Sequence, residues 1–166
     1  MRKELKPDFE TAKKLYPKIL EVIEEYADYF YLPSDSRRDS IQFKELKNKL
    51  YEIIGEKLSD DSIYPYDSVM RAEEYAIELG LPPPPVVKDI TKEELTEIVE
   101  ILSFVNPEKT VIMVNDIKFN VSSYYLHLLK KNFSSFSSDW IYYPETEYSI
   151  EDLVEKILTY KNIMYL

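Results

Sequence analysis

The sequence predicts a mainly α-helical protein, with two small four-helix-bundle-like modules in tandem and one short β-hairpin over residues 110–121. Three observations favour this fold class. Apolar residues recur at helical spacing through most of the chain. A run of prolines interrupts that spacing and cannot lie inside a helix. The two halves on either side of the run share one plan: a long helix, a variable middle, a short tyrosine-proline segment and a final helix.

The first half begins with apolar spacing that predicts a helix over residues 8–31. Pro17 lies within this stretch, so it either kinks the helix or marks its first turn. A second helix is expected over residues 41–58. Asp67 is a suitable N-cap for a third helix, which would stop at Gly80 as its C′ residue.

The proline run, Leu81-Pro82-Pro83-Pro84-Pro85, predicts extended polyproline backbone, a stiff spacer of roughly 3.1 Å per residue. It is the best candidate for a domain boundary, and a rigid surface loop inside one domain is the alternative. The predicted division is an N-terminal helical module over residues 1–81, a proline-rich linker over residues 82–88 and a C-terminal helical module over residues 89–166.

The second half opens with Thr91-Lys92-Glu93-Glu94, which has the sequence of a helix capping box. Residues 110–114 and 117–121 read as two short strands, with Asn115-Asp116 between them as a tight turn. Helical spacing then returns over residues 122–132.

The composition excludes several classes of function. The chain has no cysteine, which excludes disulfides, thiolate catalysis and cysteine zinc sites and fits the cytoplasm, where we expect the protein. One histidine, His127, excludes a multi-histidine metal site, and two glycines leave no phosphate-binding loop, so no metal or cofactor is expected. No apolar run approaches 18 residues, and we expect neither a membrane span nor a signal peptide.

The net charge of −10 disfavours nucleic acid and anionic membranes as partners, because both would be repelled. It suits a cationic protein partner, although acidic character is also ordinary among soluble bacterial proteins. Adjacent carboxylates such as Glu24-Glu25 do not converge on one point of a helix. Because no nucleophile and base can be paired either, the chain is not expected to be an enzyme and has no candidate catalytic residues.

Two short motifs carry the strongest functional signal. The C-terminal motif is Ser138-Asp139-Trp140-Ile141-Tyr142-Tyr143-Pro144, and the N-terminal motif, Ser59-Asp60-Asp61-Ser62-Ile63-Tyr64-Pro65, begins 138 − 59 = 79 residues earlier. They share serine, aspartate, tyrosine and proline at four of seven positions, which indicates an internal duplication or a chance similarity. Tyrosines beside an aspartate suit protein recognition, because tyrosine is enriched at surfaces that are part apolar and part wet.

Residues 89–161 resemble the colicin/pyocin nuclease immunity family, small four-helix proteins that neutralise a bacteriocin nuclease in the cell that makes it. The likeness is strongest at the C-terminal motif, which is close to the family's Ser-Asp-Leu-Ile-Tyr-Tyr-Pro helix. Residues 89–95 are similar to the family's first-helix entry, and residues 150–160 match its final helix in position and length. The resemblance implies a bacterial immunity protein whose partner is a cognate toxin, a cationic nuclease domain.

The resemblance also implies which residues bind that partner. These are Ser138, Asp139, Tyr142, Tyr143 and Pro144, with Asp60 and Tyr64 of the N-terminal motif as weaker candidates. Trp140 replaces an apolar residue of the family and is expected in the core. Lys130 and Lys131 stand where the family's second helix carries acidic and apolar specificity residues, and the hairpin is extra. Residues 1–81 would be a degenerate second copy.

An intracellular adaptor is the alternative. Residues 110–160 also resemble, more weakly, the BTB/POZ oligomerisation core, with its order of strand, turn, strand, helix, strand and helix. That interpretation makes residues 140–143 a buried strand, whereas the immunity interpretation makes them a short exposed helix. The conformation and exposure of Tyr142 and Tyr143 therefore separate the two.

Overall fold

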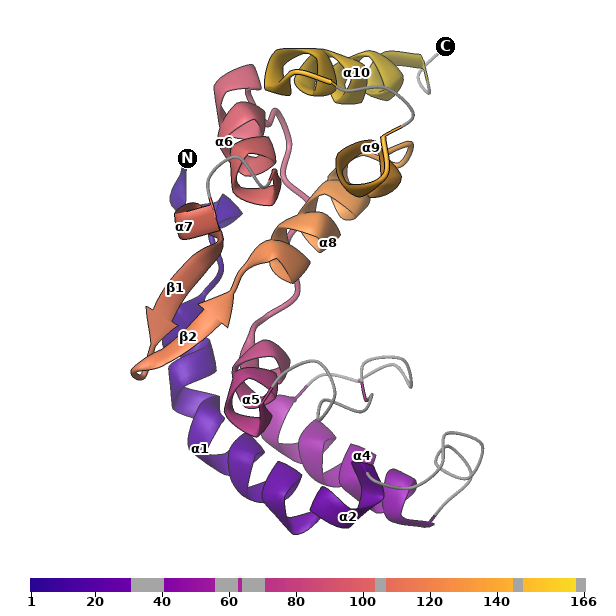
Figure 1. The fold of residues 1–166 in the computed structure, drawn as a ribbon. Coiled ribbons are helices and arrows are strands. Elements are labelled where there is room, and N and C mark those ends of the chain that lie inside the picture. Colours follow the sequence, from indigo (N-terminus) through magenta and orange to yellow (C-terminus); the bar gives the residue numbers. More distant parts are fainter. Residues whose placement is uncertain (31–40, 56–62, 64–70, 104–106, 145–147, 164–166) are drawn as a thin grey trace. The chain divides into compact units, whose positions relative to one another are not determined.

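The computed structural model describes residues 1–30, 41–55, 63, 71–103, 107–144 and 148–163 (Figure 1). These residues are mainly helical and include one two-stranded antiparallel sheet, which confirms the predicted fold class at this level. Contacts between residues divide the chain into two compact units. Unit 1 comprises Met1–Pro7, Pro83–Ile112 and Asn120–Leu166, and unit 2 comprises Asp8–Pro82 and Met113–Phe119.

The division falls inside the proline run, between Pro82 and Pro83, where the sequence predicts a boundary. Two segments are grouped differently from the prediction. Residues 1–7 belong with the C-terminal half of the chain, and residues 113–119 belong with the N-terminal half. Independent folding of residues 1–81 and 89–166 stays a prediction.

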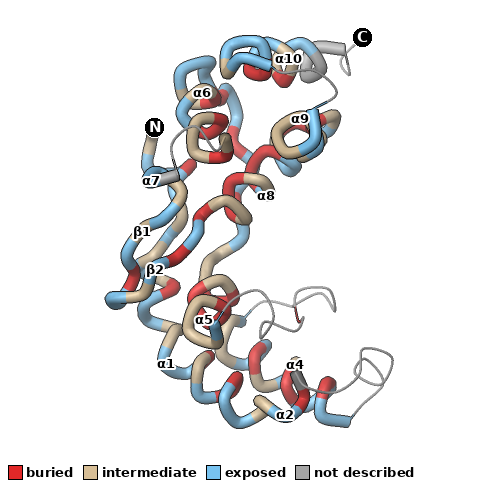
Figure 2. Tube along the Cα trace, in the orientation of Figure 1, coloured by how far each residue is buried: buried red, intermediate tan, exposed pale blue. Residues whose placement is uncertain are grey.

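Unit 2 is built on a long first helix. Its helices are α1 (Phe9–Glu25), α2 (Ala27–Phe30), α4 (Ile41–Ile54) and α5 (Ala72–Gly80). Helix α1 packs chiefly against α5 and also against α4, and the buried positions of these helices form one cluster (Figure 2). The cluster contains Ile19, Val22, Ile23, Tyr29, Phe43, Leu46, Leu50, Ile63, Tyr75, Ala76 and Leu79.

The helix ends of unit 2 differ from the predicted ones. The single helix expected over residues 8–31 breaks at Tyr26, and Pro17 lies well inside α1 rather than in its first turn. Helix α5 begins at Ala72. The predicted N-cap, Asp67, lies outside the described residues, as does the expected end of the second helix after residue 55.

Gly80 is the last residue of α5 and not the predicted C′ residue after a helix. Its φ is not positive, unlike that of Gly55 at +76°. A Cβ atom at Gly80 would lie 3.3 Å from both the Cα and the carbonyl oxygen of Ala12 in α1. The glycine is therefore explained by the close approach of two helices, where even a single added carbon makes a tight contact.

Unit 1 is centred on the helix that the capping box opens. Its helical elements are the short 3₁₀ helix η1 (Lys3–Leu5) and helices α6 (Lys92–Leu102), α7 (Pro107–Thr110), α8 (Ser122–Asn132), α9 (Asp139–Tyr142) and α10 (Ile150–Ile163). Helix α6 packs chiefly against α10 and also against α7 and α8. Leu95, Ile98 and Val99 of α6 and Val154 and Ile157 of α10 are buried.

The predicted hairpin is confirmed as β1 (Val111–Val114) and β2 (Ile117–Asn120). Asn115 and Asp116 have φ values of 49° and 62°, as a two-residue type I′ turn requires. One face of the sheet is buried, with Val114 and Phe119 on it, while Met113 on the other face is exposed. Within unit 2 the ring of Phe119 meets that of Phe9 edge-on, with their centroids 6.0 Å apart.

The segment predicted as a linker is held against the end of α8 from Pro84 onward. Lys131 Nζ donates to the carbonyl of Pro84 at 2.7 Å, and Asn132 Nδ2 donates to that of Pro85 at 3.0 Å. The backbone N–H of Val87 donates in turn to Asn132 Oδ1 at 2.7 Å. Pro84 and Val87 are buried. This part of the run is therefore a fixed part of unit 1 and not a free spacer.

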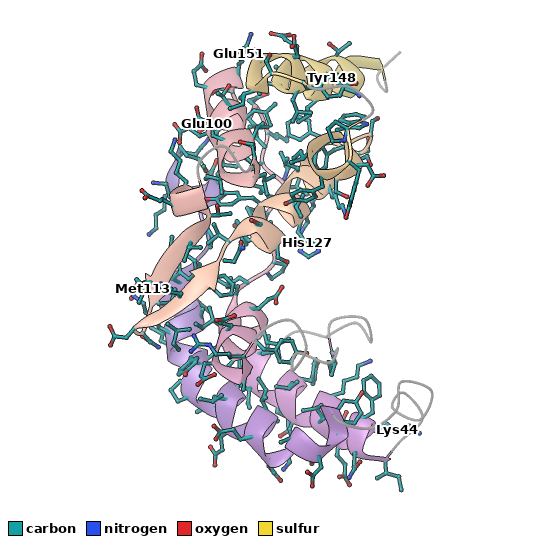
Figure 3. All side chains as sticks on the ribbon, in the orientation of Figure 1. Lys44, Glu100, Met113, His127, Tyr148 and Glu151 are labelled. Atoms are coloured by element: carbon teal, nitrogen blue, oxygen red, sulfur yellow. The ribbon has the colours of Figure 1, made fainter. Side chains whose placement is uncertain are left out.

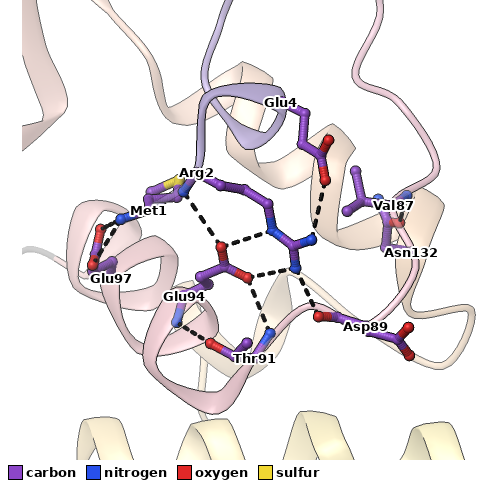
Figure 4. A network of polar contacts seen from close by, with 9 residues as sticks. All are labelled: Met1, Arg2, Glu4, Val87, Asp89, Thr91, Glu94, Glu97 and Asn132. Atoms are coloured by element: carbon purple, nitrogen blue, oxygen red, sulfur yellow. Dashed lines mark hydrogen bonds and ion pairs between the residues drawn. The ribbon is translucent and has the colours of Figure 1, made fainter.

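The first residues of the chain lie against the start of α6 (Figure 4). The Arg2 guanidinium donates to both carboxylate oxygens of Glu94, from Nε and Nη2, each at 2.8 Å. Nη2 also donates to the carbonyl of Asp89 at 2.7 Å, and the amino group of Met1 donates to Glu97 at 3.0 Å. Such two-point pairing of arginine with a carboxylate fixes geometry as well as charge.

Glu94 also completes the capping box, since its carboxylate accepts the N–H of Thr91 while the Thr91 hydroxyl accepts the N–H of Glu94. The hydrogen bonds from Arg2 are the main cause that lowers the pKa of Glu94 from 4.5 to about 2. A carboxylate whose pKa is lower in the folded state stabilises that state above its unfolded pKa. This stabilisation is lost as the pH falls from about 4.5 to about 2.

We expect Glu94→Gln to lower the free energy of unfolding at pH 7, because glutamine still suits a capping box but cannot pair with the Arg2 charge. The difference in the free energy of unfolding between Glu94→Gln and wild type should shrink as the pH falls from about 4.5 to about 2. Urea denaturation at a series of pH values measures it. Glu93→Gln, in the same first turn, is the matched control and should change stability less. A difference that stays constant down to pH 2 would contradict this role of the carboxylate.

Candidate protein-interaction site

The C-terminal motif is reached through an apolar turn at the end of α8. The N–H of Phe133 donates to the carbonyl of Leu129 at 2.8 Å, and the N–H of Phe136 donates to that of Phe133 at 2.9 Å. Both phenylalanine side chains are buried. These two anchors fix where the motif begins on unit 1.

The motif forms α9, a helix of a single turn. Ser137 Oγ accepts the N–H of Asp139 at 3.2 Å, and the carbonyl of Ser138 accepts the N–H of Tyr142 at 3.1 Å. The N–H of Tyr143 donates to the carbonyl of Asp139 at 2.9 Å. Pro144 has no N–H and stops the helix there. The serine side chain that caps the turn is thus Ser137, just before the motif, and not Ser138.

The two tyrosines of the motif point into different surroundings. Tyr143 is 80% exposed, and its neighbours Asp139 and Pro144 are exposed as well. Tyr142 is partly buried and shares a side-chain hydrogen bond with Ser122 at the start of α8; burial raises the pKa of its hydroxyl. Tyr143 is therefore the residue of the pair that is free of the core and available to a partner.

Trp140 lies on the inner side of α9 and is partly buried, whereas the sequence predicts it in the core. Its ring meets that of buried Phe136 edge-on, with centroids 6.0 Å apart and planes at 86°. Lys156 of α10 places its ammonium 4.5 Å from the Trp140 centroid and 4.4 Å from that of Tyr148. Tyr148, labelled just before α10 in Figure 3, is partly exposed.

No pattern in the sequence predicts this Lys156 contact. Lys156 stands eight positions after Tyr148 and sixteen after Trp140, so no helical spacing joins the three residues. Their meeting depends on how α10 packs within unit 1, which local pattern does not encode.

Helix α9 and the start of α10 each carry exposed carboxylates. Asp139 of α9 and Glu151 and Asp152 of α10 are exposed. Asp152 also accepts the Ser149 hydroxyl at 2.7 Å, which fixes the first turn of α10 where the sequence places it. Exposed carboxylates of this kind favour a cationic partner.

The N-terminal motif is described at one position. Asp60 and Tyr64, the weaker candidate site residues, lie outside the described residues. Ile63, which aligns with Tyr142, is buried in the core cluster of unit 2. The corresponding position therefore faces inward in both motifs.

Two further features, metal binding and membrane spanning, can be judged for the described residues alone. Among them, no group of three histidine or carboxylate side chains is placed to hold a metal ion. His127 lies exposed on α8 (Figure 3). None of the helices in the described ranges has both the length and the apolar content needed to cross a bilayer.

The adaptor interpretation expected a buried strand over residues 140–143. Residues 139–142 form α9 instead, and Tyr143 is exposed, so that expectation is wrong. No family model, curated protein or solved structure matches the chain.

Proposed function

We propose that this chain is an immunity-type protein, which binds a cationic protein toxin through the C-terminal motif and neutralises it. The observation that supports this most directly is the placement of Tyr143. A large aromatic side chain is 80% exposed at the end of a short helix that is itself held by capping and packing. Aromatic anchors of this kind dominate the binding energy of protein interfaces.

The charges around Tyr143 support a cationic partner. Asp139 is exposed four residues before it, and a carboxylate at such a position pairs with a lysine or arginine of the other protein. The net charge of −10 would also accelerate the approach of a basic domain. Tyr142 supports α9 from its inner side, and its role as a second anchor is the weaker part of the proposal.

In this proposal the chain works by covering a surface beside the toxin's active site, as the resemblance implies. No residue of the chain needs to enter the catalytic centre, and the chain has no turnover of its own. A cytoplasmic location, where a producing cell needs protection, and a tandem origin of two four-helix modules belong to the same proposal.

Co-production in a bacterial host with the toxin-like protein encoded beside this chain's gene tests the proposal. Cells that make both proteins should survive, and cells that make the toxin alone should die. In purified form the two should associate more slowly as salt is added, while dissociation changes less. Equal death with and without this chain would refute the proposal.

A further inference from the structure

Lys156 joins two aromatic rings from different segments of unit 1. Its ammonium lies over both the Trp140 and the Tyr148 rings, and it donates a hydrogen bond of 2.9 Å to the Tyr148 hydroxyl. A cation within about 6 Å of a ring centroid is attracted by the negative face of that ring, and tryptophan binds it best. The Lys156 side chain of α10 therefore contacts both Trp140 of α9 and Tyr148, which precedes α10 in the chain.

Helix α9 depends on such contacts. It has four residues, and a single helical turn is not stable by itself in water. Trp140 and Tyr142 together hold it in place, because Trp140 lies between buried Phe136 and Lys156 and Tyr142 shares a hydrogen bond with Ser122. Tyr143 follows three residues after Trp140, so its position depends on how firmly Trp140 is held.

We infer that Lys156 is the positioning residue of the partner-binding surface: by clamping Trp140 and Tyr148 it holds α9 so that Tyr143 is presented in one geometry to a basic protein surface with an apolar pocket. This inference rests on the proposed function. Fixing a binding residue before the encounter strengthens binding, because less conformational freedom is lost on association. Lys156 does this without touching the partner.

The chemistry of the partner follows from what surrounds the clamp. The charge of Lys156 is directed at two rings, whereas Asp139, Glu151 and Asp152 stay exposed. Asp139 therefore places an exposed negative charge on α9, four residues before the projecting Tyr143. The two residues fit a partner whose pocket is apolar inside and has lysine or arginine at its rim.

Trp140 is the only tryptophan of the chain, so its fluorescence reports on the clamp without any partner. In Lys156→Met, which keeps the aliphatic length but has no charge, acrylamide should quench Trp140 more efficiently. Amide hydrogen exchange of residues 140–143 should be about twofold to fivefold faster, the factor expected for a lost exposed cation–π contact. Lys156→Arg should restore both values, because arginine also makes cation–π contacts. Lys88→Met, at an exposed lysine of unit 1, is the control and should change neither.

The same variants are then tested against the toxin-like protein used above. Lys156→Met should weaken its binding about twofold to fivefold and lower the melting temperature by no more than about 4 °C, and Lys156→Arg should bind as wild type does. Unchanged exchange and quenching in Lys156→Met would overturn the inference, as would faster exchange with unchanged affinity. If wild type binds no toxin, the proposed function and the binding role of Lys156 both fail. The fluorescence and exchange data then decide only whether the clamp itself exists.

Discussion

Tyr143→Ala should weaken binding of the toxin partner by roughly 2 kcal/mol or more, about a 30-fold rise in Kd. The change removes a side chain that is 80% exposed, so it removes contact with the partner and little contact within the chain. Titration calorimetry with the purified toxin domain measures the affinity. Thermal melting measured alongside should show no change, which separates a lost contact from a lost fold.

Tyr51→Ala is the matched control, because Tyr51 is an exposed tyrosine on α4 of unit 2. It should leave the affinity unchanged. Asp139→Ala should act mainly on the dissociation rate, since it leaves a cation of the partner unpaired. Asp60→Ala and Tyr64→Ala in the N-terminal motif should weaken binding less than the matching changes in the C-terminal motif do. If these two lose binding while Tyr143→Ala retains it, the site belongs to the other half of the chain.

Gly80→Val should destabilise unit 2 by roughly 2–3 kcal/mol. Even a Cβ atom would lie 3.3 Å from the Ala12 backbone, and the two further carbons of valine must force α1 and α5 apart. A backbone cannot yield as the end of a flexible side chain does. Chemical denaturation, combined with hydrogen exchange of the amides of α1 and α5, measures the loss where it is expected.

The comparison with Gly80→Ala distinguishes close packing from helix capping. Alanine adds one carbon at a tight contact but has a higher helix propensity than glycine. The free energy of unfolding of Gly80→Ala should therefore stay within about 1 kcal/mol of wild type. Gly55→Ala has open space around it but a φ of +76°, and should cost about 1 kcal/mol through backbone strain. Similar losses for alanine and valine at Gly80 would contradict the packing explanation.

The elements that the sequence predicts well are those with local causes. The capping box at Thr91 and Glu94 opens α6 as expected, and Asn115-Asp116 form the turn of the hairpin. Helix α8 covers residues 122–132, the predicted range. In each case a few neighbouring residues specify the backbone, through a side-chain cap, a left-handed turn or helical spacing.

The features that the sequence does not predict depend on residues far apart in the chain. Glycine at the end of a helix suits a C′ position, and only the approach of Ala12 shows that Gly80 is needed for packing. The proline run has the composition of a spacer, and only the hydrogen bonds from Lys131 and Asn132 show that it is fixed. Local pattern contains no information about these pairings.

The candidate site depends partly on local sequence and partly on residues that are distant in the chain. The motif alone predicts an aromatic and acidic surface, and α9 with exposed Tyr143 has the short helical form that the immunity resemblance implies. The motif does not tell which tyrosine faces outward. The contacts of α9 decide which tyrosine faces outward. Tyr142 shares a hydrogen bond with Ser122, and Trp140 packs against Phe136, so both lie on the inner side.

The pairing of Arg2 with Glu94 has a consequence for the order in which the protein forms during synthesis. The two residues are 92 positions apart, and a ribosome adds about 5–20 residues per second. The Glu94 carboxylate is therefore made roughly 5–20 s after Arg2, and all of residues 8–82 are made in between. Unit 2 can assemble its helices in that interval, but unit 1 cannot close until translation has passed α6. Arg2 thus leaves the ribosome before residues 8–82 and belongs to the unit that is completed last.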